Sequence, residues 1–381
     1  MKILAVLFAI ILLSGCIIPF GKIHRKGFSQ EDLTVPNIYP YTSQKQEKPA
    51  ATMRSQPGYS YNISWEMGKA YISYGGVAKI FVNNTGNNDI FIYNFGIKIG
   101  SQEWRWGNND TGVFVPTGEK KKFYLSFGSP LTPGKYSYEL KISFMIDNKA
   151  GVFPFHKRNE WYDNGTSVVK TKKPLSIDIR PYNSSSNYKY SKNYYYYFDK
   201  INGMVKPFDP LIMQKANEIT SSYPGSYNVF QLCAVFDYLR EKMEYIPEEE
   251  DVWSTPSETL MDGGGDCEDF AMLFSALVTA KGGTARIYMT DNHAFASIYI
   301  GNENDANDIL KNIEEYYGTN LFFATFKDKF GYWLVADPLG SFYLGGLPVG
   351  SDVIGPLQGE KLYNWGFVGT SKVYIVDVMK E

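Results

Sequence analysis

The segment that most constrains this chain runs from residue 263 to residue 271, where the sequence reads GGGDCEDFA. It places Cys267 at the predicted first residue of a buried helix, because apolar residues follow at helical spacing. Asp266 is a residue type preferred at the N-cap, and Glu268 and Asp269 add the negative charge that a first turn favours. A thiol at a helix N-terminus meets unpaired N–H groups, so the pattern favours the nucleophilic thiolate. The neighbouring carboxylates oppose ionisation, so a further cation is needed.

One histidine is placed to supply that cation. The chain has three histidines, His24, His156 and His293. His293 follows Cys267 and stands at the start of an apolar run, and a later apolar run ends at Asp337, where Pro338 stops the predicted strand. A cysteine at a helix N-terminus, a histidine at one strand end and a carboxylate at another form the pattern of nucleophile, base and orienting group. Asp291 is the alternative orienting carboxylate.

Three motifs, in this order, resemble those of the transglutaminase-like cysteine superfamily, particularly its microbial branch. They are the stretch around Cys267 with the preceding WSTPSETL at 253–260, the His-Ala pair at 293–294, and Ala-Asp-Pro at 336–338. The resemblance covers roughly the last 170–180 residues. It implies an α+β papain-like fold in which Cys267 attacks an amide carbonyl, His293 carries the proton and Asp337 fixes the imidazole tautomer. No Cys/His metal spacing occurs in the sequence, and we expect no metal and no cofactor.

The spacing departs from the family at one point. Cys267 and His293 are 26 residues apart, whereas His293 and Asp337 are 44 residues apart, a longer gap than the resemblance leads us to expect. We interpret the surplus as an inserted helix around residues 305–317, with its apolar residues on one face.

Each of these residues also has a structural interpretation. Cys267 could be a small buried hydrophobe, His293 a strand-end histidine with satisfied hydrogen bonds, and Asp337 part of an ordinary Asp-Pro turn. Glu268, like its neighbour Asp269, is expected to cap the helix and face solvent. Trp253 could donate its indole N–H to an oxyanion hole, for which the backbone N–H of Cys267 is the other donor, or could be a core or cleft-wall aromatic.

The chain begins like an exported lipoprotein. Residues 1–16 hold a short basic start and an apolar run typical of a signal peptide, and Leu-Ser-Gly-Cys resembles a lipobox with Cys16 as the lipidated residue. The alternative is an uncleaved membrane anchor. Residues 17–58 are polar with scattered prolines, and we expect a flexible tether that holds the rest outside the cytoplasm. Apart from Cys16, the cysteines are Cys233, expected in a helical core, and Cys267; we expect both to be free.

Five Asn-x-Ser/Thr sequons precede residue 190, at Asn62, Asn83, Asn109, Asn164 and Asn183. They are candidate glycosylation sites and favour an exposed first domain in an extracytoplasmic setting. A formal net charge of −2 and the absence of a basic stripe give no reason to expect nucleic-acid binding.

Two domains are predicted. Residues 59–182 hold short alternating strands, clearest at 136–144, and resemble an immunoglobulin-like β-sandwich. Residues 183–207 form a Ser/Asn/Tyr-rich connector whose tyrosine run is expected to pack on one domain. Residues 208–381 read as helices followed by strands, which is an α+β order and agrees with a transglutaminase-like domain.

These patterns predict a membrane-tethered extracytoplasmic cysteine hydrolase or acyl-transferase that acts on peptide or protein amides. Water as second nucleophile gives a protease or amidase, and a lysine amine gives a transglutaminase. The alternative is a catalytically inactive surface protein that keeps the fold as a binding or scaffold module. The sequence does not define the oligomeric state.

Overall fold

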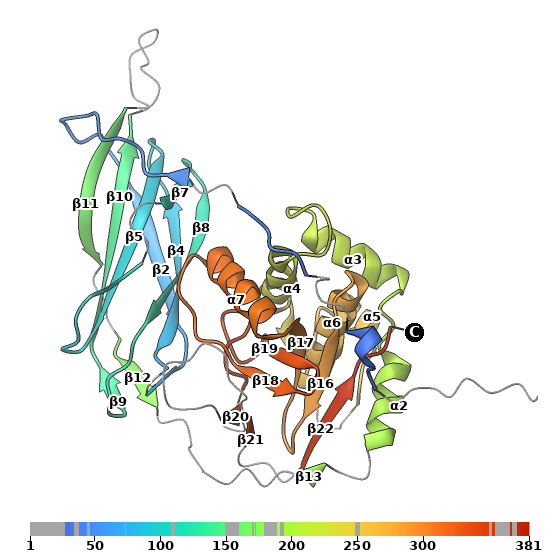
Figure 1. The fold of residues 1–381 in the computed structure, drawn as a ribbon. Helices are drawn as coiled ribbons and strands as arrows, with labels where there is room; N and C mark the ends of the chain where they lie inside the picture. Colours follow the sequence, from blue (N-terminus) through green and yellow to red (C-terminus); the bar gives the residue numbers. More distant parts are fainter. Residues whose placement is uncertain are drawn as a thin grey trace, which may run out of the picture.

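The computed structural model describes residues 27–33, 38–43, 46–72, 74–107, 111–148, 160–169, 171, 173–178, 189–190, 194–247, 252–349, 353–354, 366–367 and 372–380. Within them a β-rich N-terminal domain and an α+β C-terminal domain lie side by side (Figure 1). The predicted lipid site Cys16, together with His24, His156, Asn109 and Asn183, lies outside the described residues. No helix in the described part of the chain is long and apolar enough to cross a membrane.

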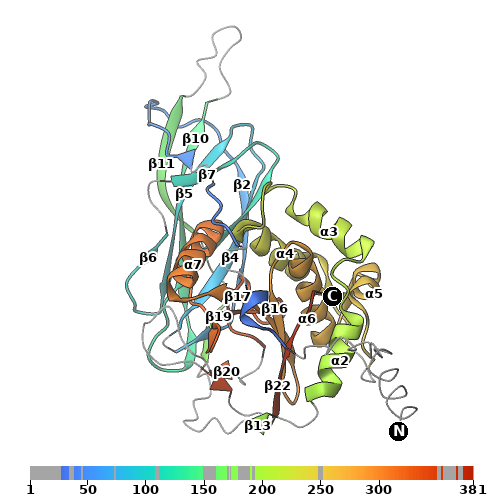
Figure 2. The same ribbon diagram turned by 45° about the vertical axis from the view of Figure 1, so that its right-hand side comes forward.

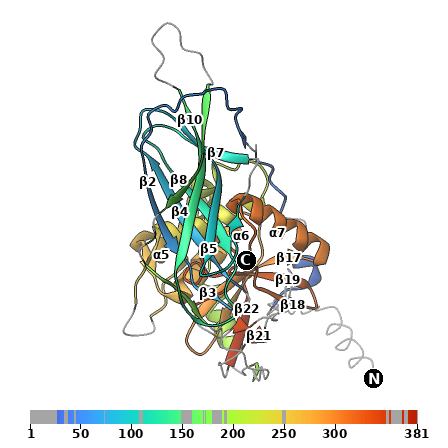
Figure 3. The same ribbon diagram turned by 90° about the vertical axis from the view of Figure 1, so that its left-hand side faces the viewer.

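The N-terminal domain is built from sheets whose strands are antiparallel, apart from the short parallel pair β3 and β12. Its main strands are β1 (Gln46–Glu47), β2 (Tyr61–Met67), β4 (Gly76–Asn84), β5 (Ile90–Ile99), β6 (Arg105–Trp106), β7 (Thr111–Val115), β8 (Lys120–Phe127), β10 (Tyr138–Asp147) and β11 (Trp161–Val169). One sheet has the order β1-β7-β5-β10-β11, with β6 also on β5, and the other has the order β2-β4-β8. The short strands β3 (Ala70–Tyr71), β9 (Gly134–Tyr136) and β12 (Leu175–Asp178) form a third sheet at one end, where Figure 1 labels β9 and β12 and Figure 3 labels β3.

The core of this domain lies between the two main sheets. Ile80 and Val82 of β4 pack in one cluster with Leu140, Ile142 and Phe144 of β10. These residues alternate with more polar ones along each strand, so one face of each sheet is apolar. The expectation of a β-rich first domain is confirmed.

The C-terminal domain is α+β, as predicted. Its helices are α2 (Tyr194–Met204), α3 (Pro210–Thr220), α4 (Val229–Lys242), α5 (Pro256–Asp262), α6 (Cys267–Ala280) and α7 (Glu303–Tyr317). Its sheet has the order β13 (Lys189–Tyr190), β22 (Lys372–Asp377), β16 (Ala285–Met289), β17 (Ala294–Gly301), β19 (Gly331–Ala336) and β18 (Thr325–Asp328). The short pairs β14 (Glu244–Tyr245) with β15 (Gly264–Gly265), and β20 (Val353–Ile354) with β21 (Gly366–Phe367), lie outside it.

Helix α6 packs on one face of this sheet, against β16 and β17 (Figure 2). Along β17, Ala296 and Ile298 face the core shared with α6, whereas Phe295 and Tyr299 face the opposite side. The sheet is therefore buried on both faces. The inserted helix expected at residues 305–317 is present as α7.

The flexible tether expected at 17–58 is wrong for the residues that the structure describes there. Leu33 and Ile38 are buried in the C-terminal domain, and the Phe28 N–H donates to Asp377 Oδ2 at 2.7 Å. Residues 46–47 form β1 and pair with β7. The segment is ordered there because its few apolar side chains cover apolar surface on the domains, which the average polarity of the segment conceals.

The two domains contact each other through charged and aromatic side chains. Lys122 Nζ of β8 lies 2.8 Å from Asp237 Oδ2 and 2.7 Å from Glu241 Oε1 of α4. Tyr124 of β8 and Tyr317 of α7 pack edge to face, with ring centroids 4.8 Å apart. The N-terminal domain is therefore fixed against the helices that support the site.

Candidate active site

Tight backbone contacts set the position of Cys267. Helix α5 ends at Gly263, whose φ of 75° suits glycine, and β15 then pairs with β14. A Cβ on Gly264 would lie 2.3 Å from the Glu244 carbonyl oxygen, so a side chain there would push the two strands apart. The glycine run thus lets β15 pair closely with β14, and this pairing fixes the position at which α6 begins.

Asp266 is the N-cap residue, but its side chain does not make the capping bond that the sequence predicts. Instead Asp269 accepts the Asp266 N–H at 3.4 Å and the Ser254 N–H at 2.9 Å. Asp269 is fully buried and thereby joins the start of α6 to the segment before α5. Asp269 therefore provides the hydrogen-bond acceptor at the start of α6, although it lies inside the helix. The Asp266 carboxylate turns toward Glu268.

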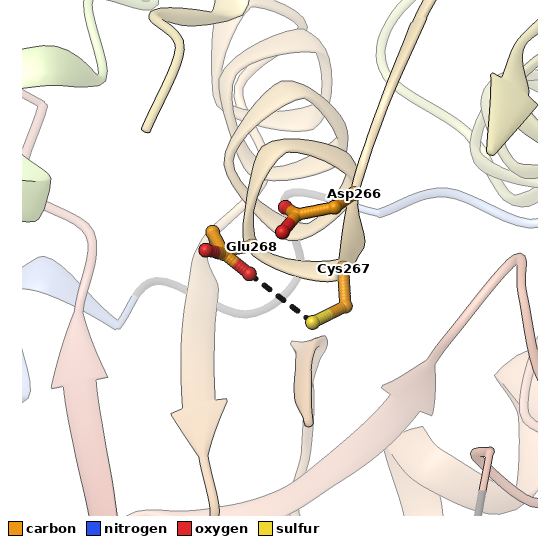
Figure 4. Close-up of side chains that lie close together, drawn as sticks. All are labelled: Asp266, Cys267 and Glu268. Atoms are coloured by element: carbon orange, nitrogen blue, oxygen red, sulfur yellow. Dashed lines mark hydrogen bonds between the residues drawn. The ribbon is translucent and has the colours of Figure 1, made fainter. Parts of the chain in front are cut away.

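The Cys267 thiol donates a hydrogen bond to the Glu268 carboxylate, with Sγ 3.1 Å from Oε2 (Figure 4). Burial, this hydrogen bond and the charge of Glu268 raise the pKa of Cys267 from 9.0 to about 12. Burial likewise raises the pKa of Glu268 to about 8. The thiol is therefore protonated at rest, chiefly because it is buried, and Glu268 opposes its ionisation as expected from the sequence. Glu268 is not, however, the solvated capping group expected, since its residue is 8 % exposed.

His293 and Asp337 form a direct pair. The imidazole Nε2 lies 2.8 Å from Asp337 Oδ2, and the two side chains are 9 % and 2 % exposed. Strand pairing explains the contact, because β17 and β19 are antiparallel neighbours with Ala296 opposite Ala336. His293 precedes β17 and Asp337 follows β19. Because these strands are antiparallel, both residues lie at the same end of the strand pair.

Two backbone N–H groups hold the Asp337 carboxylate in place. Leu339 N–H donates to Oδ1 at 3.0 Å, and Val349 N–H donates to Oδ2 at 2.7 Å. With both oxygens accepting backbone bonds, the carboxylate accepts the imidazole N–H in one orientation. The ring then carries its proton on Nε2, and Nδ1 is its basic nitrogen.

The thiol lies beside the start of β17, the strand that His293 precedes. The backbone N–H of Ala294, the residue after His293, donates toward the Cys267 sulfur and partly offsets the rise in pKa of the thiol. Within the described residues, however, the hydrogen-bond acceptor of the thiol is Glu268 and not the His293 ring. The structure thus brings His293 and Asp337 together and places Cys267 next to them, with the thiol proton directed elsewhere.

The other predicted residues fall around this centre. Trp253 stacks on Tyr197, with ring centroids 6.1 Å apart, and Lys200 Nζ lies 3.4 Å from the centre of the Trp253 ring. This places it as a partly buried aromatic wall. Asp291 is exposed. Cys233 is buried and free, as expected, and Cys267 is free as well.

Three sequon asparagines are described. Asn62 is exposed, whereas Asn83 and Asn164 are half-buried. The Asn164 amide already donates to Ser167 Oγ at 3.2 Å. A glycan at this asparagine would have to displace that bond.

Sequence reasoning missed one residue at the site. Tyr245 of β14 is 55 % exposed, and partial burial together with the charges of Cys267, Asp266 and Glu268 raises its pKa. It therefore lies beside the thiol as an exposed aromatic. Tyr245 lies there because β14 pairs with β15, and the local sequence does not predict this pairing of two residues with two.

The described residues contain one group that could hold a metal ion. The ligand atoms of Asp266, Cys267 and Glu268 lie within 4.8 Å of one another. An S–H···O bond already joins the sulfur to one of the carboxylates. The arrangement is thereby accounted for as a thiol–carboxylate pair, and we assign it no metal.

Residues 214–338 match the family model of the transglutaminase-like superfamily, and this range contains Cys267, His293 and Asp337. No curated protein matches the chain. Among solved structures, it is similar to the CARDB domain of a Pyrococcus furiosus protein, solved in complex with di-metal ions, at 11 % identity over 34 % of this chain and 100 % of that chain, with a TM-score of 0.19.

Two other solved structures are similar at equally low identity. A candidate protease from Parabacteroides distasonis shares 9 % identity over 62 % of this chain and 64 % of that chain, with a TM-score of 0.25. A candidate cysteine protease from Cytophaga hutchinsonii shares 12 % identity over 83 % of this chain and 100 % of that chain, with a TM-score of 0.22. These TM-scores are too low to support an argument about fold or function.

Proposed function

Because residues 214–338 form a transglutaminase-like domain, we propose that the chain is a cysteine hydrolase or acyl-transferase acting on amide bonds of peptides or proteins. The observation that carries the proposal is the buried His293–Asp337 pair at 2.8 Å, with Cys267 beside the start of β17, which His293 precedes. A nucleophile next to a base that is itself oriented by a carboxylate is the arrangement used for acyl transfer.

The chemistry begins with the thiol proton. In the proposed step, Cys267 Sγ turns from Glu268 toward the ring and gives its proton to His293 Nδ1, while the sulfur attacks the substrate carbonyl carbon. A C–S bond forms, and the carbonyl π electrons move to oxygen, where the Cys267 N–H at the start of α6 offers a hydrogen bond. Collapse of this intermediate breaks the C–N bond, and the His293 proton passes to the leaving amine.

A thioester on Cys267 then meets a second nucleophile. Water gives a carboxylic acid and makes the chain a protease or amidase, whereas a primary amine gives a new amide and makes it a transglutaminase. In both cases His293 removes a proton from the nucleophile and returns it to the sulfur. Asp337 stabilises the imidazolium form in each half of the cycle.

A specific observation favours a second function. The resting thiol is hydrogen bonded to Glu268 and has a pKa of about 12, so it is protonated and weakly nucleophilic at neutral pH. A protein that keeps the fold for binding has no need of an ionised thiol. We therefore propose, as the alternative, a catalytically inactive binding or scaffold protein.

The location is proposed from sequence features outside the described residues. We propose that Cys16 is lipidated and anchors the chain to a membrane with both domains outside the cytoplasm, and that the first domain is an immunoglobulin-like accessory domain. Mass spectrometry of the native N-terminus tests the anchor. A diacylglyceryl group on Cys16 supports it, and an intact Met1 contradicts it.

Alkylation of Cys267 by iodoacetamide separates the two functions without a known substrate. The parent is compared at pH 7.5 with Cys267→Ala and His293→Ala, and the alkylated cysteine is identified by mass spectrometry. The catalytic proposal expects no labelling at position 267 in the first variant, and labelling of Cys267 at least tenfold slower in the second. Equal alkylation of Cys267 in the parent and in His293→Ala would favour the binding protein.

A substrate assay then distinguishes the two reactions. Dimethylated casein, whose lysines are blocked, is incubated with the parent and dansylcadaverine. Release of short peptides shows hydrolysis, and fluorescence on casein shows transfer to an amine. Both signals must disappear in Cys267→Ala.

A further inference from the structure

A cavity of about 570 Å³ lies between the two domains, and its lining includes Leu339, whose N–H donates to Asp337. The lining also includes residues before and after the start of β4, the end of β8, α4, and the chain segments that flank β18 and β19. Cys267, His293 and Asp337 are not part of that lining. Its volume is in the range of small-molecule sites. The cavity is therefore a candidate binding site separate from the proposed chemistry.

Positive charge dominates the lining. Arg240 of α4 and the exposed Arg105 and Lys69 contribute cations, and Glu314 of α7 contributes one carboxylate. Glu314 Oε1 already accepts the Leu321 N–H at 3.0 Å. In the described part of the chain, neither guanidinium has a carboxylate within ion-pair distance. Two arginines that form no ion pair among the described residues, brought into one cavity from different domains, indicate an anionic ligand.

Arg240 is held in a defined position. One Nη atom donates to the Pro338 carbonyl oxygen at 3.1 Å, and the guanidinium carbon lies 4.9 Å from the centre of the Phe342 ring. These contacts use one of its five N–H donors and the face of its plane, so the remaining donors can meet a ligand. A preorganised guanidinium loses little entropy when it binds an anion.

Aromatic side chains form part of the remaining wall. Tyr71, Tyr74, Phe322 and Phe342 line the cavity, and Tyr74 and Phe322 pack edge to face with ring centroids 5.3 Å apart. A ligand that also buries apolar surface against these rings would gain more than a bare ion would.

We propose that this interdomain cavity binds a small organic anion, with a carboxylate or phosphate held by Arg105 and Arg240 and a flat apolar body against the aromatic wall. The proposal does not depend on the proposed catalytic function, since no residue of the catalytic centre lines the cavity.

Calorimetric titration of the full chain with three probes tests the chemistry. The probes are 2-naphthoate, 2-naphthyl phosphate and the uncharged 2-naphthamide. We expect one site for at least one of the two anions and binding of the amide at least tenfold weaker. The tighter of the two anions identifies the group that the arginines recognise. Equal affinity for the amide and the anions, or no binding of any probe at millimolar concentration, would overturn the proposal.

Two variants test the location. Arg105→Gln removes one charge from the N-terminal domain side of the cavity, and the exposed Arg54→Gln is the matched control outside it. Gly128→Leu keeps both arginines but fills space, because a Cβ there meets nothing closer than Arg105 Cζ at 4.0 Å. We expect at least tenfold weaker binding of the anion in Arg105→Gln and Gly128→Leu, and parent-like binding in Arg54→Gln. Parent-like binding in both cavity variants would refute the site.

Discussion

Replacing Glu268 by glutamine tests the thiol–carboxylate pair, because the two groups titrate together. Burial raises the pKa of Glu268 to about 8, and the carboxylate helps to raise the pKa of Cys267 to about 12. The pair therefore loses one proton near pH 8, chiefly from Glu268, and the second near pH 12. Below pH 8 the carboxyl is neutral and does not suppress the thiolate. Above pH 8 it is charged and does.

The alkylation rate of Cys267 should follow from this order. In the parent, the fraction of molecules with a Cys267 thiolate beside a neutral Glu268 carboxyl increases up to pH 8 and then levels off. Above pH 8, Glu268 is charged, and a thiolate then has to form beside a second negative charge. In Glu268→Gln the thiolate continues to increase about tenfold per pH unit. The variant should therefore match the parent at pH 7 and exceed it by about ten- to thirtyfold at pH 9.5.

The assay is the pseudo-first-order rate of iodoacetamide alkylation from pH 6.5 to pH 10, with Cys267→Ala as the blank for the buried Cys233. Asp262→Asn is the matched control, since it removes an exposed carboxylate five residues before Cys267. Its profile should bend near pH 8, as in the parent. A parent and a Glu268→Gln variant whose rates keep a constant ratio across the range would refute the coupling.

Three further substitutions test other parts of the structure. Lys122→Met removes the cation beside Asp237 and should lower the free energy of unfolding by about 1–3 kcal/mol at pH 7 in denaturant titrations. The same network lowers the pKa of Glu241 in the folded protein. The ion pairs therefore stabilise the fold above the ordinary pKa of a glutamate, near 4.5, and this stabilisation is lost as the pH falls through the lower pKa of the folded state. Equal destabilisation by the substitution at pH 3 and pH 7 would contradict this. Leu33→Ala should lower the free energy of unfolding by about 2–4 kcal/mol, whereas Leu131→Ala, at a residue 84 % exposed, should leave it almost unchanged. Equal melting temperatures for the two variants would show that the N-terminal segment is not packed. Asp337→Asn should slow peptide release on the order of 10²–10⁴-fold with little change in melting temperature, and an unchanged rate would remove this residue from the mechanism.

Much of the C-terminal domain could be predicted from local pattern. Apolar periodicity and capping residues located α6, and an unexplained gap of 44 residues between His293 and Asp337 indicated an inserted helix, which is α7. The contact between those two residues depends on strand order, which spacing alone does not give. It arises because β17 and β19 are neighbours and their relevant ends lie at one edge.

The N-terminal segment shows where average composition misleads. Residues 17–58 are polar and hold several prolines, so their mean properties predict a flexible tether. Two apolar side chains, Leu33 and Ile38, are nevertheless buried, and Phe28 is tied to the far end of the chain at Asp377. A few anchors suffice to order a segment when a matching apolar surface exists, and here that surface is formed by helices and strands of the C-terminal domain, far along the chain.

The state of the thiol could not be predicted because two opposing effects act on one atom and their balance depends on a rotamer. A helix N-terminus stabilises a nearby negative charge by about 0.3–1 kcal/mol, whereas a hydrogen bond to an ionised group contributes about 1.5–3 kcal/mol. Burial is the largest cause of the raised pKa of Cys267, the hydrogen bond to Glu268 at 3.1 Å adds to it, and the thiol stays protonated. A rotation about the Cα–Cβ bond toward His293 would exchange this acceptor for the imidazole, so substrate binding has to supply the bias that turns the sulfur. The catalytic proposal therefore requires that a bound amide lower the pKa of Cys267, a requirement that the binding-protein alternative does not share.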